Sequence, residues 1–341
     1  MHNADRAALR IGSGIAVAAF ICYGTALPMP HLGCIMAWIV LCQGKPLPLK
    51  KGIVVGLLLT TTMIGGVLLV PLLTYYPQPT LLLIALLLYR LMLMSLAGKS
   101  TPAMLLIVAI AIIPVAGLVE QTLAIGIAQM MGIGIITGTL VNRLTLALFP
   151  PQPAVATEKK PSTAVVVPSR YLAGRAVLIV LPVWFLALSN PAFYIPAVMK
   201  TVMLAQQTNT LSAKQSGLEL VLSTLMGALL ALVLWCGLSL WPSLLMLVLW
   251  LALMSLWVAR RLLKLTPSRF PPSFWSNAWI TALILFGPAI QDSASGKDVW
   301  TAAAMRAALY VAVALYGWAC VALLAKYRAH RPATAELSSG D

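Results

Sequence analysis

Charged residues are scarce in this sequence: they make up 9% of the chain, and only eight of them are acidic. A soluble globular domain contains about 25% charged residues. Apolar residues make up 61% of the chain, and they come in runs of about 20, the length that crosses a bilayer's hydrocarbon. The shortage of charge therefore excludes a soluble domain and predicts an all-α polytopic membrane protein.

Recognisable catalytic and metal-binding patterns are also missing. The three histidines are far apart, and the five cysteines form no CxxC pair, so no metal site and no disulfide framework are expected. The glycines of segment 132–138 lie in an apolar run without a following Lys-Ser/Thr, which indicates helix packing rather than a phosphate-binding loop. No Ser/His/Asp set or paired carboxylates indicate an enzyme, and no cofactor is expected.

The net charge of +15 raises the question of nucleic-acid binding. Such binding needs a basic face on a soluble surface, whereas the basic residues here lie in short loops between apolar runs. Lysine and arginine in such loops set the orientation of a membrane protein. We therefore interpret the charge as a topology signal and expect no nucleic-acid partner.

Hydropathy and helix breakers predict twelve spans, arranged as six, a linker and six. Repeats at residues 1–149 and 171–325 flank a proline-rich linker at 150–170, and a polar tail covers 326–341. The second and eighth spans are short, which fits tilted, re-entrant or broken helices. The predicted spans are 7–27, 31–42, 52–73, 80–97, 102–119, 122–149, 172–188, 192–206, 217–240, 243–258, 274–290 and 299–325.

The distribution of basic residues tests this layout. With a cytoplasmic N-terminus, all but four of the 23 basic residues lie in inside loops or ends. The four are Lys297, in an outside loop, and Arg90, Lys200 and Arg306, within spans. Inside loops rich in lysine and arginine are the known orientation signal. The count predicts twelve spans with both ends on the cytoplasmic side.

The two halves share a weak internal similarity. A polar loop with lysine leads into a glycine-bearing helix at 44–66 and again at 206–230, and Ile113-Pro114 is matched by Gly287-Pro288. With an even number of spans each, the halves are parallel repeats, which place a binding site near the midplane between them. We therefore expect a substrate path beside the short second and eighth spans.

Two basic residues in the middle of spans are candidate substrate contacts. Arg90 follows a run of leucines, and Lys200 lies within the short eighth span. A charge inside the membrane is costly unless it faces protein or water, so each predicts a contact for an anionic substrate. The alternative for both is a side chain that snorkels to the surface. Arg90 could instead form a structural ion pair, and the role of Lys200 could be with a coupling ion rather than the substrate.

Two further charged residues are candidates with different roles. Arg306, in the last span, predicts a third anion contact, and its alternative is an interfacial pair with Asp298 or Asp292. Glu219, near the start of the ninth span, predicts a proton-coupling site. Its alternative is a solvated acid at a helix N-terminus, where the helix dipole favours negative charge.

The pattern as a whole resembles the fusaric acid resistance / aromatic acid exporter superfamily. The resemblance rests on Arg6 and Arg10 before the first span, the short second span ending in KPLPLKKG, and the glycine-bearing third span, all repeated from Arg175 onward. It implies efflux of small aromatic or other organic acids, or drugs, across the bacterial inner membrane. It also implies a periplasmic adaptor protein and an outer-membrane channel as partners. The larger members' cytosolic domains are absent from this sequence.

The sequence therefore predicts an efflux permease driven by the proton-motive force, with Arg90, Lys200 and Arg306 as substrate contacts and Glu219 as proton carrier. A different class is kept open beside it. The scarcity of charge within the spans also fits a scaffold that anchors the adaptor without moving substrate. A homo-oligomer is compatible with either function.

Overall fold

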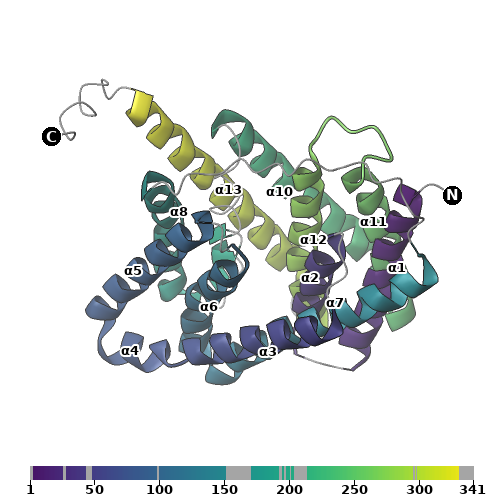
Figure 1. Ribbon diagram of the computed structural model, residues 1–341, viewed down its shortest axis with the longest axis horizontal. Coiled ribbons are helices and arrows are strands. Elements are labelled where there is room, and N and C mark those ends of the chain that lie inside the picture. Colours follow the sequence, from purple (N-terminus) through teal and green to yellow (C-terminus); the bar gives the residue numbers. More distant parts are fainter. Residues whose placement is uncertain are drawn as a thin grey trace.

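The computed structural model describes the chain from residue 3 to residue 329, except residues 26–27, 44–47, 98–99, 151–169, 192–193, 196, 200, 203–212, 295 and 297. Twelve helices are defined in the described residues, and they form one bundle (Figure 1). They are α1 (Asn3–Gly24), α2 (Pro30–Cys42), α3 (Leu49–Gly66), α4 (Leu69–Tyr75), α5 (Pro77–Leu96), α6 (Ser100–Val119), α7 (Gln121–Leu148), α8 (Arg170–Ser189), α10 (Ala213–Leu240), α11 (Leu244–Leu262), α12 (Pro272–Ala294) and α13 (Val299–Ala329).

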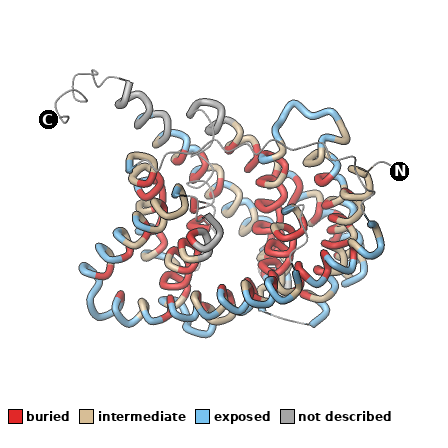
Figure 2. Tube along the Cα trace, in the orientation of Figure 1, coloured by how far each residue is buried: buried red, intermediate tan, exposed pale blue. Residues whose placement is uncertain are grey.

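The helices confirm the predicted class of fold. Within the described residues there is no strand. Nine helical stretches there are long and apolar enough to cross a membrane, and Pro30–Cys42 and Leu106–Val119 are shorter apolar helices. Buried residues gather where the helices face one another, and exposed residues lie on the outer sides of the helices (Figure 2). The exposed residues include large apolar ones such as Leu57, Leu82 and Leu86. Apolar side chains on the outside suit contact with lipid.

The third predicted span, 52–73, lies within one apolar stretch, Leu49–Tyr75, that is long enough to cross a membrane, but its helix is interrupted by a turn. Helix α3 ends at Gly66 and α4 begins at Leu69, with Val67 and Leu68 in a turn. Pro71 has no N–H and its ring clashes with the carbonyl of Val67, while glycines 65 and 66 favour the helix least. The chain tightens instead, and the backbone N–H of Val67 donates to Ile64 at 2.9 Å.

Three predicted segments lie partly outside the described residues. They are the linker 150–170, the eighth span 192–206 and the tail 326–341. The predicted tail begins too early, because α13 continues to Ala329.

The directions in which helices pack agree with the predicted alternation of spans. A Cβ built on Gly12 would touch Leu256, and one on Gly24 would touch Leu244, so α1 and α11 are antiparallel. The same test pairs Gly134 with Gly33 and Gly138 with Ala37, so α2 and α7 are parallel. The predicted layout makes α1 the first span and α11 the tenth, which should be antiparallel. It makes α2 the second span and α7 the sixth, which should be parallel. One miscounted span between α1 and α11 would reverse their relation.

The two predicted halves are interlocked rather than separate. Helix α1 packs on α11 as well as on α2 and α7 of its own half, and its counterpart α8 packs on α5. Two tryptophans add hydrogen bonds between the halves: Trp38 of α2 donates to Ser276 of α12 at 3.2 Å, and Trp184 of α8 donates to the Ala111 carbonyl of α6 at 2.9 Å. The duplication itself stays a prediction.

Glycines let α3 and α7 approach closely, which yields a stability prediction. A Cβ on Gly56 would lie 2.9 Å from the Gly132 carbonyl oxygen, whereas one on Gly65 of the same helix would meet nothing within 4 Å. We expect Gly56→Ala to lower the free energy of unfolding by about 1–3 kcal/mol, because backbone cannot yield. Gly65→Ala should be neutral or slightly stabilising. Thermal unfolding in detergent, followed by tryptophan fluorescence, compares them, and equal melting temperatures would contradict this packing.

Candidate functional site

A cavity of about 410 Å³ lies between the helices of the bundle. Its walls come from α2, α6, α7, α12 and α13, together with Ile195 and Met199 of the partly described eighth span. Side chains lining it are mostly apolar, and the polar ones are His31, Gln291 and Arg306. Pockets of about 300–1,000 Å³ with apolar walls and a few polar groups are typical of small-molecule sites.

The cavity lies toward the predicted outer side. Leu123 is in the first turn of α7, Gln291 is in the last turn of α12, and Arg306 is two turns into α13. Each of these helix ends joins a loop predicted to be outside. A second cavity, of about 510 Å³, shares Met29 and Leu123 with the first and includes Glu120 among its lining residues.

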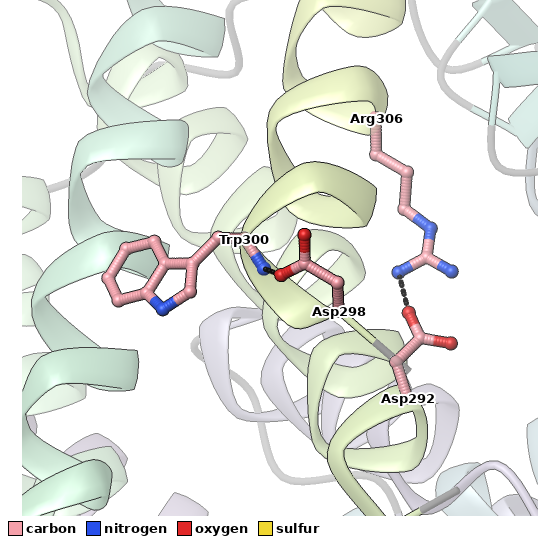
Figure 3. A network of polar contacts seen from close by, with 4 residues as sticks. All are labelled: Asp292, Asp298, Trp300 and Arg306. Carbon is pink, nitrogen blue, oxygen red and sulfur yellow. Dashed lines mark hydrogen bonds and ion pairs between the residues drawn. The ribbon is translucent and has the colours of Figure 1, made fainter. Parts of the chain in front are cut away.

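The charged group in the first cavity is an arginine paired with an aspartate. The Arg306 Nη1 atom donates to the Asp292 Oδ2 atom at 2.6 Å, with side-chain exposures of 20% and 11% (Figure 3). Ion pairs withdrawn from water are short and strong. The contact joins the end of α12 to the start of α13, and it bears out the Asp292 partner that the sequence left as an alternative.

Asp298, the other candidate partner, has a different role. Its carboxylate accepts a hydrogen bond from the backbone N–H of Trp300 at 3.1 Å (Figure 3). It accepts another from the Thr301 hydroxyl. These bonds, led by the one from Thr301, hold the pKa of Asp298 below its usual value. Asp298 therefore caps the N-terminus of α13 and leaves Arg306 to Asp292.

His31 brings an unused polar atom to the cavity wall. Its side chain is 6% exposed, and its Nδ1 atom has no hydrogen-bond partner among the described residues. The ring packs on Gly287 of α12, where a Cβ would lie 2.2 Å from its Cγ atom. The Tyr310 hydroxyl, one turn beyond Arg306, is likewise buried and without a partner in the described residues. Buried polar atoms without partners are costly, and of these two residues only His31 lines the cavity.

Below His31, two tryptophans fix α2 against α12. The Trp38 and Trp279 ring centroids are 5.8 Å apart and the rings are tilted by 51°. Both side chains are fully buried. Large rigid side chains at this contact hold His31 and Gly287 in register, so this cavity wall is fixed by packing rather than by a loop.

The structure brings one of the four predicted site residues to the cavity. Arg306 lines it, whereas Arg90 is exposed on α5 and lines neither of the two cavities described above. Lys200 lies outside the described residues, although its neighbour Met199 lines the cavity. The predicted path beside the second and eighth spans agrees with the cavity's position.

Glu219 lies on the predicted cytoplasmic side, away from the cavity. It is half-buried in the second turn of α10 and accepts a hydrogen bond from the Ser273 hydroxyl of α12. Since α10 begins at Ala213, Glu219 is not in the first helical turn, and the helix-terminus alternative does not fit. The proton-coupling role of Glu219 stays a prediction. The hydrogen bond from Ser273 also gives Glu219 a structural role, because it joins α10 to α12.

Two residues of the cavity were not predicted from the sequence, His31 and Gln291. His31 is the second residue of the short helix α2, where a path was expected, so its position was the available signal. Gln291 lies three residues after Pro288 in an apolar helix, and nothing in the sequence distinguishes it from other polar residues in spans. In the described residues, no group of three or more His, Cys, Asp or Glu side chains could hold a metal ion.

The fold is that of a polytopic α-helical membrane protein with a cavity between its helices. Residues 7–148 match the model of a family described as "Protein of unknown function (DUF2955)". The matched residues run from the first turns of α1 to the last residue of α7. No curated protein and no solved structure matches the chain.

Proposed function

We propose that the chain is an efflux permease that carries small organic acids, aromatic ones above all, across the bacterial inner membrane. The observation that supports it most is the cavity between the helices, where one guanidinium lies among apolar walls. Arginine binds carboxylates through two parallel hydrogen bonds, and apolar walls suit the ring or chain of the acid.

The cavity favours transport over the scaffold function. A scaffold needs no cavity between its helices, and burying a charged group beside an apolar cavity is costly. Intramembrane ionisable groups next to a cavity are typical of substrate pathways. The energy source that we propose is the proton-motive force, through its electrical part. An anion leaving a cell with a negative interior gains about 2.3 kcal/mol per 100 mV.

The proposal extends to a periplasmic adaptor protein, which the resemblance of the sequence implies. The cavity lies toward the side where such a partner would collect the substrate. Transport by the purified chain alone would show that the permease moves substrate without the adaptor protein.

Closing the mouth of the cavity is expected to stop transport. Leu123 is half-buried and lines both cavities, so Leu123→Trp should lower efflux at least tenfold by filling the entrance. Leu83→Trp is the matched control, because Leu83 is 41% exposed on α5 and should keep wild-type efflux. The assay follows benzenesulfonate leaving preloaded proteoliposomes, since a sulfonate stays ionised and crosses lipid poorly. Equal efflux by both variants would argue against the cavity as the path.

A further inference from the structure

The guanidinium that the proposed function assigns to the substrate is already occupied. Arg306 lines the cavity, yet its Nη1 atom is held by the Asp292 carboxylate at 2.6 Å. Asp292 follows Gln291, which also lines the cavity, at the end of α12. An internal carboxylate therefore already holds one of the guanidinium nitrogens that a substrate carboxylate could use.

The contact is one that a substrate can replace. It joins one nitrogen to one oxygen, whereas a guanidinium has five N–H donors and forms its best carboxylate pairs through two parallel bonds. An acid in the cavity can approach Arg306 from the cavity side and use such a fork. His31 also lines this cavity, and its ring packs on Gly287 of α12 with the Nδ1 atom against that helix.

We propose that Asp292 is an internal competitor of the substrate for Arg306. The substrate carboxylate displaces Asp292 when it binds, and the return of Asp292 to Arg306 expels it toward the predicted outer side. This inference rests on the proposed function and names the chemistry of its site. The structure, with its Arg306–Asp292 pair formed and its cavity on the outer side, then corresponds to the state after release.

Exchange of one carboxylate for another also sets the charge that moves. The empty site is neutral, because Arg306 and Asp292 compensate each other. The site loaded with a monoanion carries one net negative charge while Asp292 stays ionised. The loaded form therefore responds to the membrane potential and the empty form does not, which gives the cycle a direction out of a cell with a negative interior.

Removing the competitor is expected to tighten binding rather than weaken it. Benzoate binding to the purified full chain is measured by titration calorimetry, for wild type and Asp292→Asn. We expect Asp292→Asn to bind benzoate about tenfold tighter or more, within the usual range of coupling between two ligands of one group. In the transport assay, the same variant should show a lower KM and a lower kcat, because release is slower.

Three variants complete the test. Asp292→Glu keeps a competing carboxylate and should bind benzoate within a few-fold of wild type. Asp298→Asn removes the neighbouring acid that caps α13 and should leave the affinity unchanged. If Asp292→Asn does not fold, Asp292→Ser replaces it in the same titration.

The inference is overturned if loss of the carboxylate at position 292 leaves benzoate affinity unchanged or lowers it. It is also overturned if neither wild type nor the variant binds benzoate. In both cases, benzenesulfonate efflux by the wild-type chain still decides the proposed function. Efflux without tighter binding by the variant keeps the permease and removes the competitor, whereas absent efflux removes both.

Discussion

Arg306→Gln is expected to reduce kcat/KM for benzenesulfonate efflux by about 100-fold or more, because truncating one partner of a buried charge contact costs about 2–5 kcal/mol. Glutamine has similar length and can still donate one hydrogen bond, but it carries no charge and cannot form the two-bond fork. The assay is efflux from proteoliposomes containing equal amounts of folded protein.

Two controls separate a lost substrate contact from a damaged fold. Arg306→Gln removes the guanidinium that pairs with Asp292, and breaking a buried ion pair on one side destabilises a protein strongly. The double variant Arg306→Gln/Asp292→Asn removes both charges, so it should fold like wild type and still fail to transport. Arg90→Gln removes the exposed arginine of α5 and should transport normally. Loss of efflux in Arg90→Gln, with normal efflux in Arg306→Gln, would contradict the account. It would place the substrate contact on α5 rather than on α13.

Gly287→Ala is expected to have the second largest effect, through the position of His31. The added Cβ would lie 2.2 Å from the Cγ atom and 2.3 Å from the Cβ atom of His31. Those atoms are close to the α2 backbone, so the side chain cannot swing away and the two helices must separate. We expect a loss of about 1–3 kcal/mol in the free energy of unfolding, and weaker benzoate binding because the cavity wall moves.

A double-variant cycle tests the cause. His31→Gly removes both the ring and the Cβ atom that the new methyl group would strike, so His31→Gly/Gly287→Ala should recover stability lost by Gly287→Ala alone. Residues in contact show coupling energies of about 0.5–3 kcal/mol. Gly174→Ala is the control, because a Cβ there would meet nothing within 4 Å. Simple additivity of the His31 and Gly287 substitutions in thermal unfolding would contradict their contact.

Much of the fold follows from hydropathy, because a bilayer leaves few choices. A long apolar run must become a helix in lipid, since no water satisfies its backbone groups. The basic loops then fix the direction of each helix, and the packing directions of α1 with α11 and of α2 with α7 agree with that alternation. The break between α3 and α4 was not predicted, although Pro71 and the two glycines before it carry the signal.

The site was harder to predict, because the sequence does not say which side of an apolar helix faces protein. Arg90 and Arg306 look alike in sequence, each a single arginine within an apolar run. Arg90 faces outward, whereas Arg306 faces a cavity and an aspartate on the preceding helix. In a membrane, outward and inward faces are both apolar, so the hydrophobic periodicity that orients helices in soluble proteins is weak.

His31 and Gly287 show the same limit for a contact between helices. Each is unremarkable in its own helix, and their importance comes from a packing contact between residues far apart in sequence. The packing role of a glycine in a helix can be recognised only when the residue it contacts on the neighbouring helix is known. The polar wall of the cavity therefore had to come from the structure.

The most direct test of the account is a structure of the full chain with 4-iodobenzoate, located by the anomalous signal of its iodine. The account predicts an iodine peak inside the cavity between α2, α7 and α12, with the carboxylate on Arg306 and Asp292 turned away. A carboxylate bound at Arg90 or elsewhere on the surface, with the Arg306–Asp292 pair intact and the cavity empty, would contradict it.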